Sequence, residues 1–89
     1  MRAVISVIGK DRVGIIAGVS AVLAQCNVNI LDLSQTIMQD IFTMVMLVDV
    51  SGATISFADL AGRLERLGQE MGLQIRIQHE DIFNSMHRI

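Results

Sequence analysis

Residues 3–30 read AVISVIGKDRVGIIAGVSAVLAQCNVNI, and the periodicity of this stretch changes twice. Positions 3–8 are apolar on both faces apart from Ser6, which is typical of a strand in the middle of a sheet. Over 14–26, apolar side chains recur at spacings of three and four, which predicts a helix. The asparagines at 27 and 29 then predict a turn, because asparagine tolerates left-handed backbone.

Two glycines mark the beginning of this predicted helix. Gly14 and Gly18 lie four residues apart, and neither favours a helix by propensity. Because glycine has no side chain, both positions would let the helix approach the sheet or a ligand closely. We therefore expect a valine at position 14 to distort the loop or to weaken ligand binding.

Two further strands are predicted next along the chain. Residues 30–39 alternate, with Leu31, Leu33 and Ile37 on one face and polar side chains on the other, so this strand should be half-exposed. After a turn at Gln39-Asp40, residues 41–50 are apolar on both faces, which predicts a second central strand.

A second helix and a fourth strand complete the pattern. Ser56 and Asp59 resemble a capping box at the start of a helix over 56–71, and Gly72 stands where a C-terminal cap is expected. Residues 73–80 alternate between apolar and polar side chains, as an edge strand with one wet face does.

The order strand, helix, strand, strand, helix, strand predicts an α+β ferredoxin-like βαββαβ sandwich. Right-handed crossovers place both helices on one face of an antiparallel sheet with strand order 4-1-3-2. The open face then carries apolar side chains, which predicts a partner. Residues 1–89 should form a single domain, with a core at 2–80 and a C-terminal tail at 81–89.

The tail 81–89 carries apolar residues at spacings of three and four: Ile82, Phe83, Met86 and Ile89. This pattern predicts a short amphipathic helix, with Asn84, Ser85 and Arg88 facing water. Because so short a helix is unstable alone, we expect it to dock on the partner subunit or near the fourth strand; a frayed end is the alternative.

Composition excludes several function classes. Aromatic residues are 3% of the chain and the net charge is -2, so neither base stacking nor a basic field favours direct binding of nucleic acid or membranes. The single cysteine rules out an internal disulfide, and the first residues lack the pattern of a signal peptide, so we expect a cytoplasmic protein.

No group of residues predicts catalysis, a metal site or a cofactor. Cys26 lies on the apolar helical stripe and is expected to be a buried core thiol. His79 and His87 are separated by eight residues, which does not place them on one helical turn, so we interpret both as surface residues. No nucleophile motif is present, and we expect no enzyme activity.

The loop before the first helix is the candidate ligand site. Unpaired N–H groups at a helix N-terminus can hold a carboxylate, and Asp11 or Arg12 could add a charged contact. The alternative is that Asp11 only caps the helix, Gly14 only packs, and Lys10 and Arg12 are only solvated.

Residues 9–30 contain a D-R-V-G-I loop, an A-V-L-A helix segment and N-V-N-I entering the next strand. Together they resemble the signature of ACT domains, and the element order extends the resemblance over about residues 2–80. The chain is similar to small stand-alone bacterial ACT proteins and, more loosely, to the glycine cleavage system regulator, which has two such domains.

This resemblance implies a regulatory module that pairs with another copy and often binds a small molecule, commonly an amino acid, at the interface. It implies a ligand site at the first strand-to-helix loop and the start of the second strand, with these matching positions: Asp11, Arg12, Val13, Gly14, Ile15, Asn27, Asn29 and Ile30. No catalytic domain is attached, so a signal would pass to a separate protein partner. A homodimer that serves only structure or protein interaction, without a ligand, is the alternative.

Overall fold

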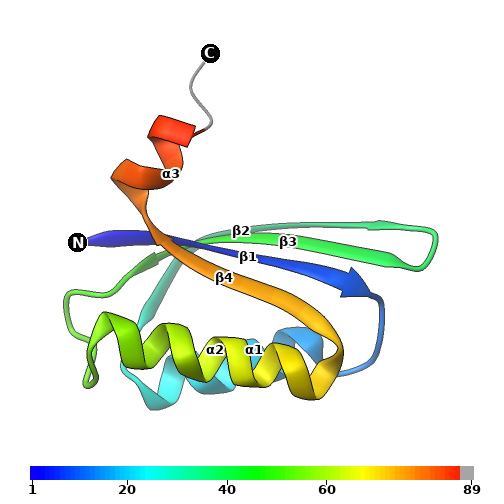
Figure 1. Ribbon diagram of the computed structural model, residues 1–89, viewed down its shortest axis with the longest axis horizontal. Coiled ribbons are helices and arrows are strands. Elements are labelled where there is room, and N and C mark those ends of the chain that lie inside the picture. The colour runs from blue at the N-terminus through cyan, green and yellow to red at the C-terminus, as the bar shows by residue number, and fades with distance from the viewer. Residues whose placement is uncertain (87–89) are drawn as a thin grey trace.

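The computed structural model describes residues 1–86 and contains four strands and three helices (Figure 1). They follow the predicted order and end with one additional helix: β1 Arg2–Lys10, α1 Ile15–Gln25, β2 Asn29–Met38, β3 Ile41–Asp49, α2 Phe57–Met71, β4 Leu73–His79 and α3 Glu80–Met86. The strands form an antiparallel sheet in the order β2-β3-β1-β4, with α1 and α2 on one face, which confirms the predicted fold. The helix α3 stands on the opposite side of the sheet.

The core lies between the sheet and the helices α1 and α2. The central strands β1 and β3 point alternate side chains toward it, and the largest of these are fully buried: Ile5, Val7, Met44, Met46 and Val48. Leu23 from α1 and Leu60 and Leu64 from α2 close the core from the other side. The two strands predicted to be central therefore are central.

The strand β2 differs from its predicted half-exposed pattern, because all ten of its residues are exposed. Its register against β3 shifts between Ile30 and Asp32, so Leu31 forms a bulge and leaves the alternation. Leu33 and Ile37 pair with the inward-facing Met46 and Phe42, and therefore lie on the helix side of the sheet. They are 37% and 51% exposed, because α2 packs mainly on β4 and α1 contacts β2 little.

The predicted signals at the ends of α2 are confirmed. Ser56 is the N-cap, and its hydroxyl accepts a hydrogen bond of 3.1 Å from the backbone N–H of Asp59. Gly72 ends the helix with a φ of 69°, in the left-handed region where glycine carries no Cβ penalty. Sequence therefore located both ends of α2 correctly.

Two glycines set how closely α2 packs, and one of them corrects an expectation. A Cβ built on Gly18 would lie 3.4 Å from Met71 Sδ, so this glycine brings α1 close to α2 rather than to the sheet or a ligand. A Cβ on Gly68 would lie 2.7 Å from the carbonyl oxygen of Leu73, in the backbone of β4. The absence of a side chain at Gly68 therefore lets α2 sit directly on β4.

The predicted tail helix is present as α3, and it packs on β1 and β4. Arg2 forms an ion pair of 2.6 Å with Glu80, at the start of α3. Phe83 is half-buried as predicted, whereas Ile82 is 51% exposed and does not dock on its own sheet. His87, Arg88 and Ile89 lie outside the described residues.

Truncation after Glu80 tests the contribution of α3 while keeping the ion pair to Arg2. We expect the free energy of unfolding to fall by about 1 kcal/mol, and Tm by about 4–8 °C, because the truncated chain no longer buries the apolar surface that Phe83 covers. Thermal melts of both chains measure this change. The matched control is Ile82→Ala, which should melt within 2 °C of the parent chain, about the effect expected of an exposed site. Equal melting of the truncated and full chains would show that α3 is a frayed end.

Candidate functional site

A surface hollow of about 270 Å³ lies where β1 passes into α1. We call it the loop hollow. Its wall comes from the loop, the first turn of α1 and the neighbouring strands β2 and β3, through these residues: Asp11, Arg12, Gly14, Ile15, Ile16, Ala17, Gln35, Ile37 and Phe42. Four of the eight residues predicted as ligand-binding are thus brought together here, namely Asp11, Arg12, Gly14 and Ile15.

Three backbone or side-chain features hold the loop in place. Gly14 is the N-cap of α1 and has a φ of 93°. The backbone N–H of Asp11 donates to the carbonyl oxygen of Asp40 at 2.7 Å, which ties the loop to the turn between β2 and β3. Arg12 donates through Nη1 to the carbonyl oxygen of Met71 at 3.3 Å, at the C-terminal end of α2.

These contacts correct the alternative interpretation of the loop. Among residues 1–86, no side chain caps α1, so Asp11 does not act as a helix cap. In the described part of the chain no atom lies within 4 Å of a Cβ built on Gly14, so this glycine serves the left-handed backbone and not close packing. Arg12 contacts α2 and is not merely solvated.

The loop hollow offers donors, an amide and apolar walls. The carbonyl of Gly14 accepts the first helical bond, from Gly18 N–H at 2.9 Å, so the three preceding N–H groups have no acceptor within the helix. These groups carry the positive end of the helix dipole and can hold a carboxylate. Gln35 supplies a side-chain amide, while Ile37 and Phe42 supply apolar surface.

The other predicted site residues lie elsewhere in the same chain. Asn27 and Asn29 line a separate hollow of about 290 Å³ beyond the C-terminal end of α1, together with Asp49 and Gly52. The side chain of Asn27 already donates to the carbonyl oxygen of Gly52 at 2.9 Å, and its φ of 57° confirms the predicted left-handed turn.

The remaining two predicted residues also lie outside the loop hollow. Neither Val13, which is 97% exposed, nor Ile30, which is 37% exposed, is among the residues that line that hollow. A single chain therefore does not bring the eight predicted ligand-binding residues together in one hollow.

Five residues of the loop hollow were missed by sequence reasoning: Ile16, Ala17, Gln35, Ile37 and Phe42. A signal for Gln35 was present, because it interrupts an otherwise apolar set of odd-numbered positions from Leu31 to Ile37. A polar residue on an apolar stripe indicates that its side chain makes a polar interaction. The membership of Phe42 depends on the pairing of β2 with β3, which the local pattern does not specify.

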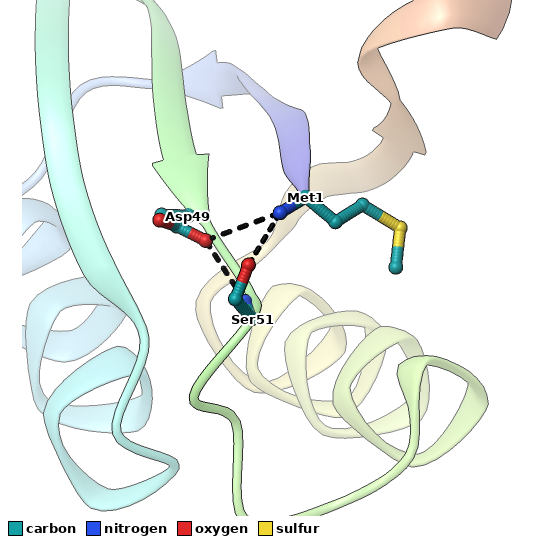
Figure 2. Close-up of polar contacts among 3 residues, drawn as sticks. All are labelled: Met1, Asp49 and Ser51. Carbon is teal, nitrogen blue, oxygen red and sulfur yellow. Dashed lines mark hydrogen bonds and ion pairs between the residues drawn. The ribbon is translucent and has the colours of Figure 1, made fainter.

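Near the second hollow, the N-terminus is anchored to the end of β3 (Figure 2). The amino group of Met1 lies 3.6 Å from the Asp49 carboxylate and donates to the hydroxyl of Ser51. The backbone N–H of Ser51 donates to Asp49 at 2.9 Å, and this hydrogen bond is the main cause that lowers the pKa of the Asp49 carboxyl. Asp49 therefore has a structural role in this chain.

The thiol and the imidazole within the described range have structural surroundings. Cys26 is fully buried, as predicted, and its Sγ accepts a contact of 3.7 Å from Arg63. His79 is half-buried rather than a free surface residue, because its ring stacks on Phe57 with the centroids 4.1 Å apart. Among residues 1–86, no three histidine, cysteine or acidic side chains group closely enough to hold a metal ion.

Comparison with known proteins identifies the family to which a chain of this geometry belongs. The family model of the ACT domain matches residues 2–78. This range contains β1, α1, β2, β3 and α2, and all of β4 except its last residue. The chain belongs to the ACT domain family. Within residues 1–86 of this ACT domain chain, no helix combines the length and apolar content needed to cross a membrane.

Related proteins share this ACT domain over most of its length. A UPF0237 protein from Methanocaldococcus jannaschii is 60% identical over 88 residues, which cover 99% of this chain and 98% of the relative. An ACT domain protein from Streptococcus pneumoniae has a TM-score of 0.81 and 41% identity, with 98% of both chains covered. A putative glycine cleavage system transcriptional repressor has a TM-score of 0.73 and 28% identity, over 86% of this chain and 44% of that one.

Replacement of Gly14 tests the loop. We expect Gly14→Val to lower the free energy of unfolding by about 1–3 kcal/mol, because a β-branched residue is strained at a φ of 93°. Gly14→Asn is the matched control and should lose less, because asparagine tolerates left-handed backbone. Urea unfolding measures both. Equal stability of the valine variant and the parent would show that the loop has another conformation in solution.

Proposed function

We propose that this ACT domain chain is a cytoplasmic regulatory module, and not an enzyme, that binds an amino acid as a homodimer and acts on a separate polypeptide. The observation that carries the proposal is the exposure of β2, an edge strand of ten residues that borders the loop hollow. An exposed edge of this length with little charge is a surface on which another strand pairs. The free, buried Cys26 suits a reducing compartment.

Antiparallel pairing of β2 with β2 of a second copy supports a shared ligand site. Asn29 begins β2, and Met38 ends it beside the Asp40 turn that holds the loop through Asp11. In such a pairing the start of one strand lies beside the end of the other. Asn29 and Ile30 of the second copy would therefore approach the loop hollow of the first.

The charge on β2 is compatible with this self-pairing. Asp32 is the only charged residue between Asn29 and Met38, and it lies away from the centre of the strand. A pairing centred on Ser34 sets Asp32 against the uncharged Thr36, without like-charge repulsion. The two copies would also cover Leu33 and Ile37, whose side chains are exposed in one chain.

The chemistry of the shared site suits an amino acid. The N–H groups of Ile15, Ile16 and Ala17 would hold the α-carboxylate. The carboxylate of Asp11 and the amide oxygen of Gln35 are acceptors for the α-ammonium group, and Asn29 of the second copy can donate or accept. The volume of about 270 Å³ and the walls from Ile37 and Phe42 favour a small apolar side chain.

Calorimetric titration of the full chain with each amino acid tests the proposal. We expect one or a few small amino acids to bind, and Asn29→Ala to weaken that binding at least about tenfold, the loss of one good hydrogen bond. The matched control is Asn84→Ala in the exposed part of α3, which should bind as the parent does. Absence of binding by every amino acid at millimolar concentration, with the dimer intact, would instead favour the ligand-free interaction dimer.

A further inference from the structure

The second edge of the sheet, β4, borders a hollow of about 530 Å³, which is larger than the loop hollow. We call it the edge groove. One wall is a stripe of α2 formed by Ala61, Glu65 and Gln69, and the other is β4 from Leu73 to Gln78. Because β1 is the only strand of the described chain that pairs with β4, one side of the β4 backbone faces this groove without a neighbouring strand there.

The edge groove is charged differently on its two sides. Glu65 lies on α2, on the helix side of β4. Arg76 pairs with Ser6 and alternates with the buried Ile75, so its side chain lies on the open side of the sheet. Among residues 1–86, neither Glu65 nor Arg76 forms an ion pair, so both charges are available to a partner.

The charge of β4 disfavours a second copy as the occupant. Arg76 is the central residue of the seven-residue strand from Leu73 to His79. Full antiparallel pairing of two copies of β4 would place the two Arg76 side chains directly opposite each other, which is destabilising. The strand β2 has no such charge at its centre, so the two edges of the sheet favour different occupants.

We propose that the edge groove binds an extended segment of another polypeptide, which adds to the sheet as a strand beside β4. Successive residues of an added strand point to opposite faces. A basic side chain toward Glu65 and an acidic side chain toward Arg76 would therefore lie an odd number of positions apart in the segment. β-Branched residues between them suit an added strand that lies over Ala61 and Ile75.

The edge groove would be the binding site for the separate partner that the proposed function requires. The proposal rests on the proposed function only in this respect. The edge groove lies at β4, whereas the loop hollow lies beside β2 at the other edge of the sheet. A bound segment at β4 therefore leaves both β2 and the loop hollow free. Binding at the two edges can be measured separately on one sample.

Panning a displayed library of random peptides on the full chain tests the assignment. We expect the enriched peptides to carry an acidic and a basic residue at an odd separation, and to shift the backbone amide signals of β4 and the facing stripe of α2. Replacement of the acidic residue by lysine should weaken binding at least about tenfold, because it sets like charges together. Arg76→Glu should reverse this preference, and Arg76→Gln should abolish it.

Arg66→Glu is the matched control, because Arg66 is exposed on α2 outside the edge groove and its substitution changes the net charge equally. It should leave the preference unchanged. Failure to enrich any peptide, signal shifts at β2 or α1 instead of β4, or an unchanged preference in both Arg76 variants would overturn the proposal. Loss of amino-acid binding or of the dimer, with peptide binding intact, would contradict the proposed function alone.

Discussion

We expect the double variant Ser34→Lys, Thr36→Lys to sediment as a monomer under conditions in which the parent chain is a dimer. Both side chains are exposed in the middle of β2 and pair with the open-face residues Val45 and Thr43. In an antiparallel pairing of two copies of β2 centred on Ser34, the two ammonium groups added at this position would lie directly opposite each other across the twofold axis. The dissociation constant of the dimer should rise at least about 100-fold, since like charges at an interface cost several kcal/mol.

The matched control adds two lysines on the opposite side of the molecule. Gln69→Lys, Gln74→Lys has the same net charge, uses exposed residues beside β4, and should remain a dimer. The monomeric variant should also lose amino-acid binding, because Asn29 of the second copy no longer reaches the loop hollow. A double variant that keeps both its mass and its ligand would exclude β2 as the interface.

The second large effect concerns Gly68, where α2 packs against the backbone of β4. We expect Gly68→Ala to lower the free energy of unfolding by about 1–3 kcal/mol, because its Cβ would lie 2.7 Å from the carbonyl oxygen of Leu73. A backbone atom of a strand cannot rotate away as a side chain can, so α2 must move off β4. For a domain of this size each kcal/mol corresponds to about 4–8 °C in Tm.

The same helix contains the matched control for this substitution. A Cβ on Gly62 meets no atom of residues 1–86 within 4 Å, so Gly62→Ala should raise the free energy of unfolding by about 1 kcal/mol through helix propensity. Both variants change one glycine of α2 to alanine, and urea unfolding compares them directly. Stabilisation by both substitutions to the same extent would contradict the close packing of α2 on β4.

Patterns within single elements were sufficient to predict most of the fold. The runs at β1 and β3 are apolar on both faces, which predicted two central strands, and both strands are central. Their open-face side chains Ile8 and Val45 stay exposed in one chain. Ser56 and Gly72 predicted the ends of α2 correctly, because caps act within one helical turn. The tail pattern likewise predicted α3 over the residues that the structure describes.

The candidate site was predicted only in part. The loop residues from Asp11 to Ile15 were found, apart from the exposed Val13, because the strand, loop and helix that position them are consecutive in the chain. Gln35 and Phe42 were missed, since they enter the loop hollow through the pairing of β2 with β3 and the register shift at Leu31. Asn29 matched the family pattern, yet it lies at the other end of α1 within one chain.

Local periodicity and capping therefore specify which segments are strands and helices, since these signals depend on neighbours within a few residues. The exposure of β2, the closeness of Gly68 to Leu73 and the different charges of the two sheet edges follow from contacts between distant segments. Such contacts depend on where α1 and α2 come to rest on the sheet. Packing of the whole chain decides that position, because each helix must bury its apolar stripe against several strands at once.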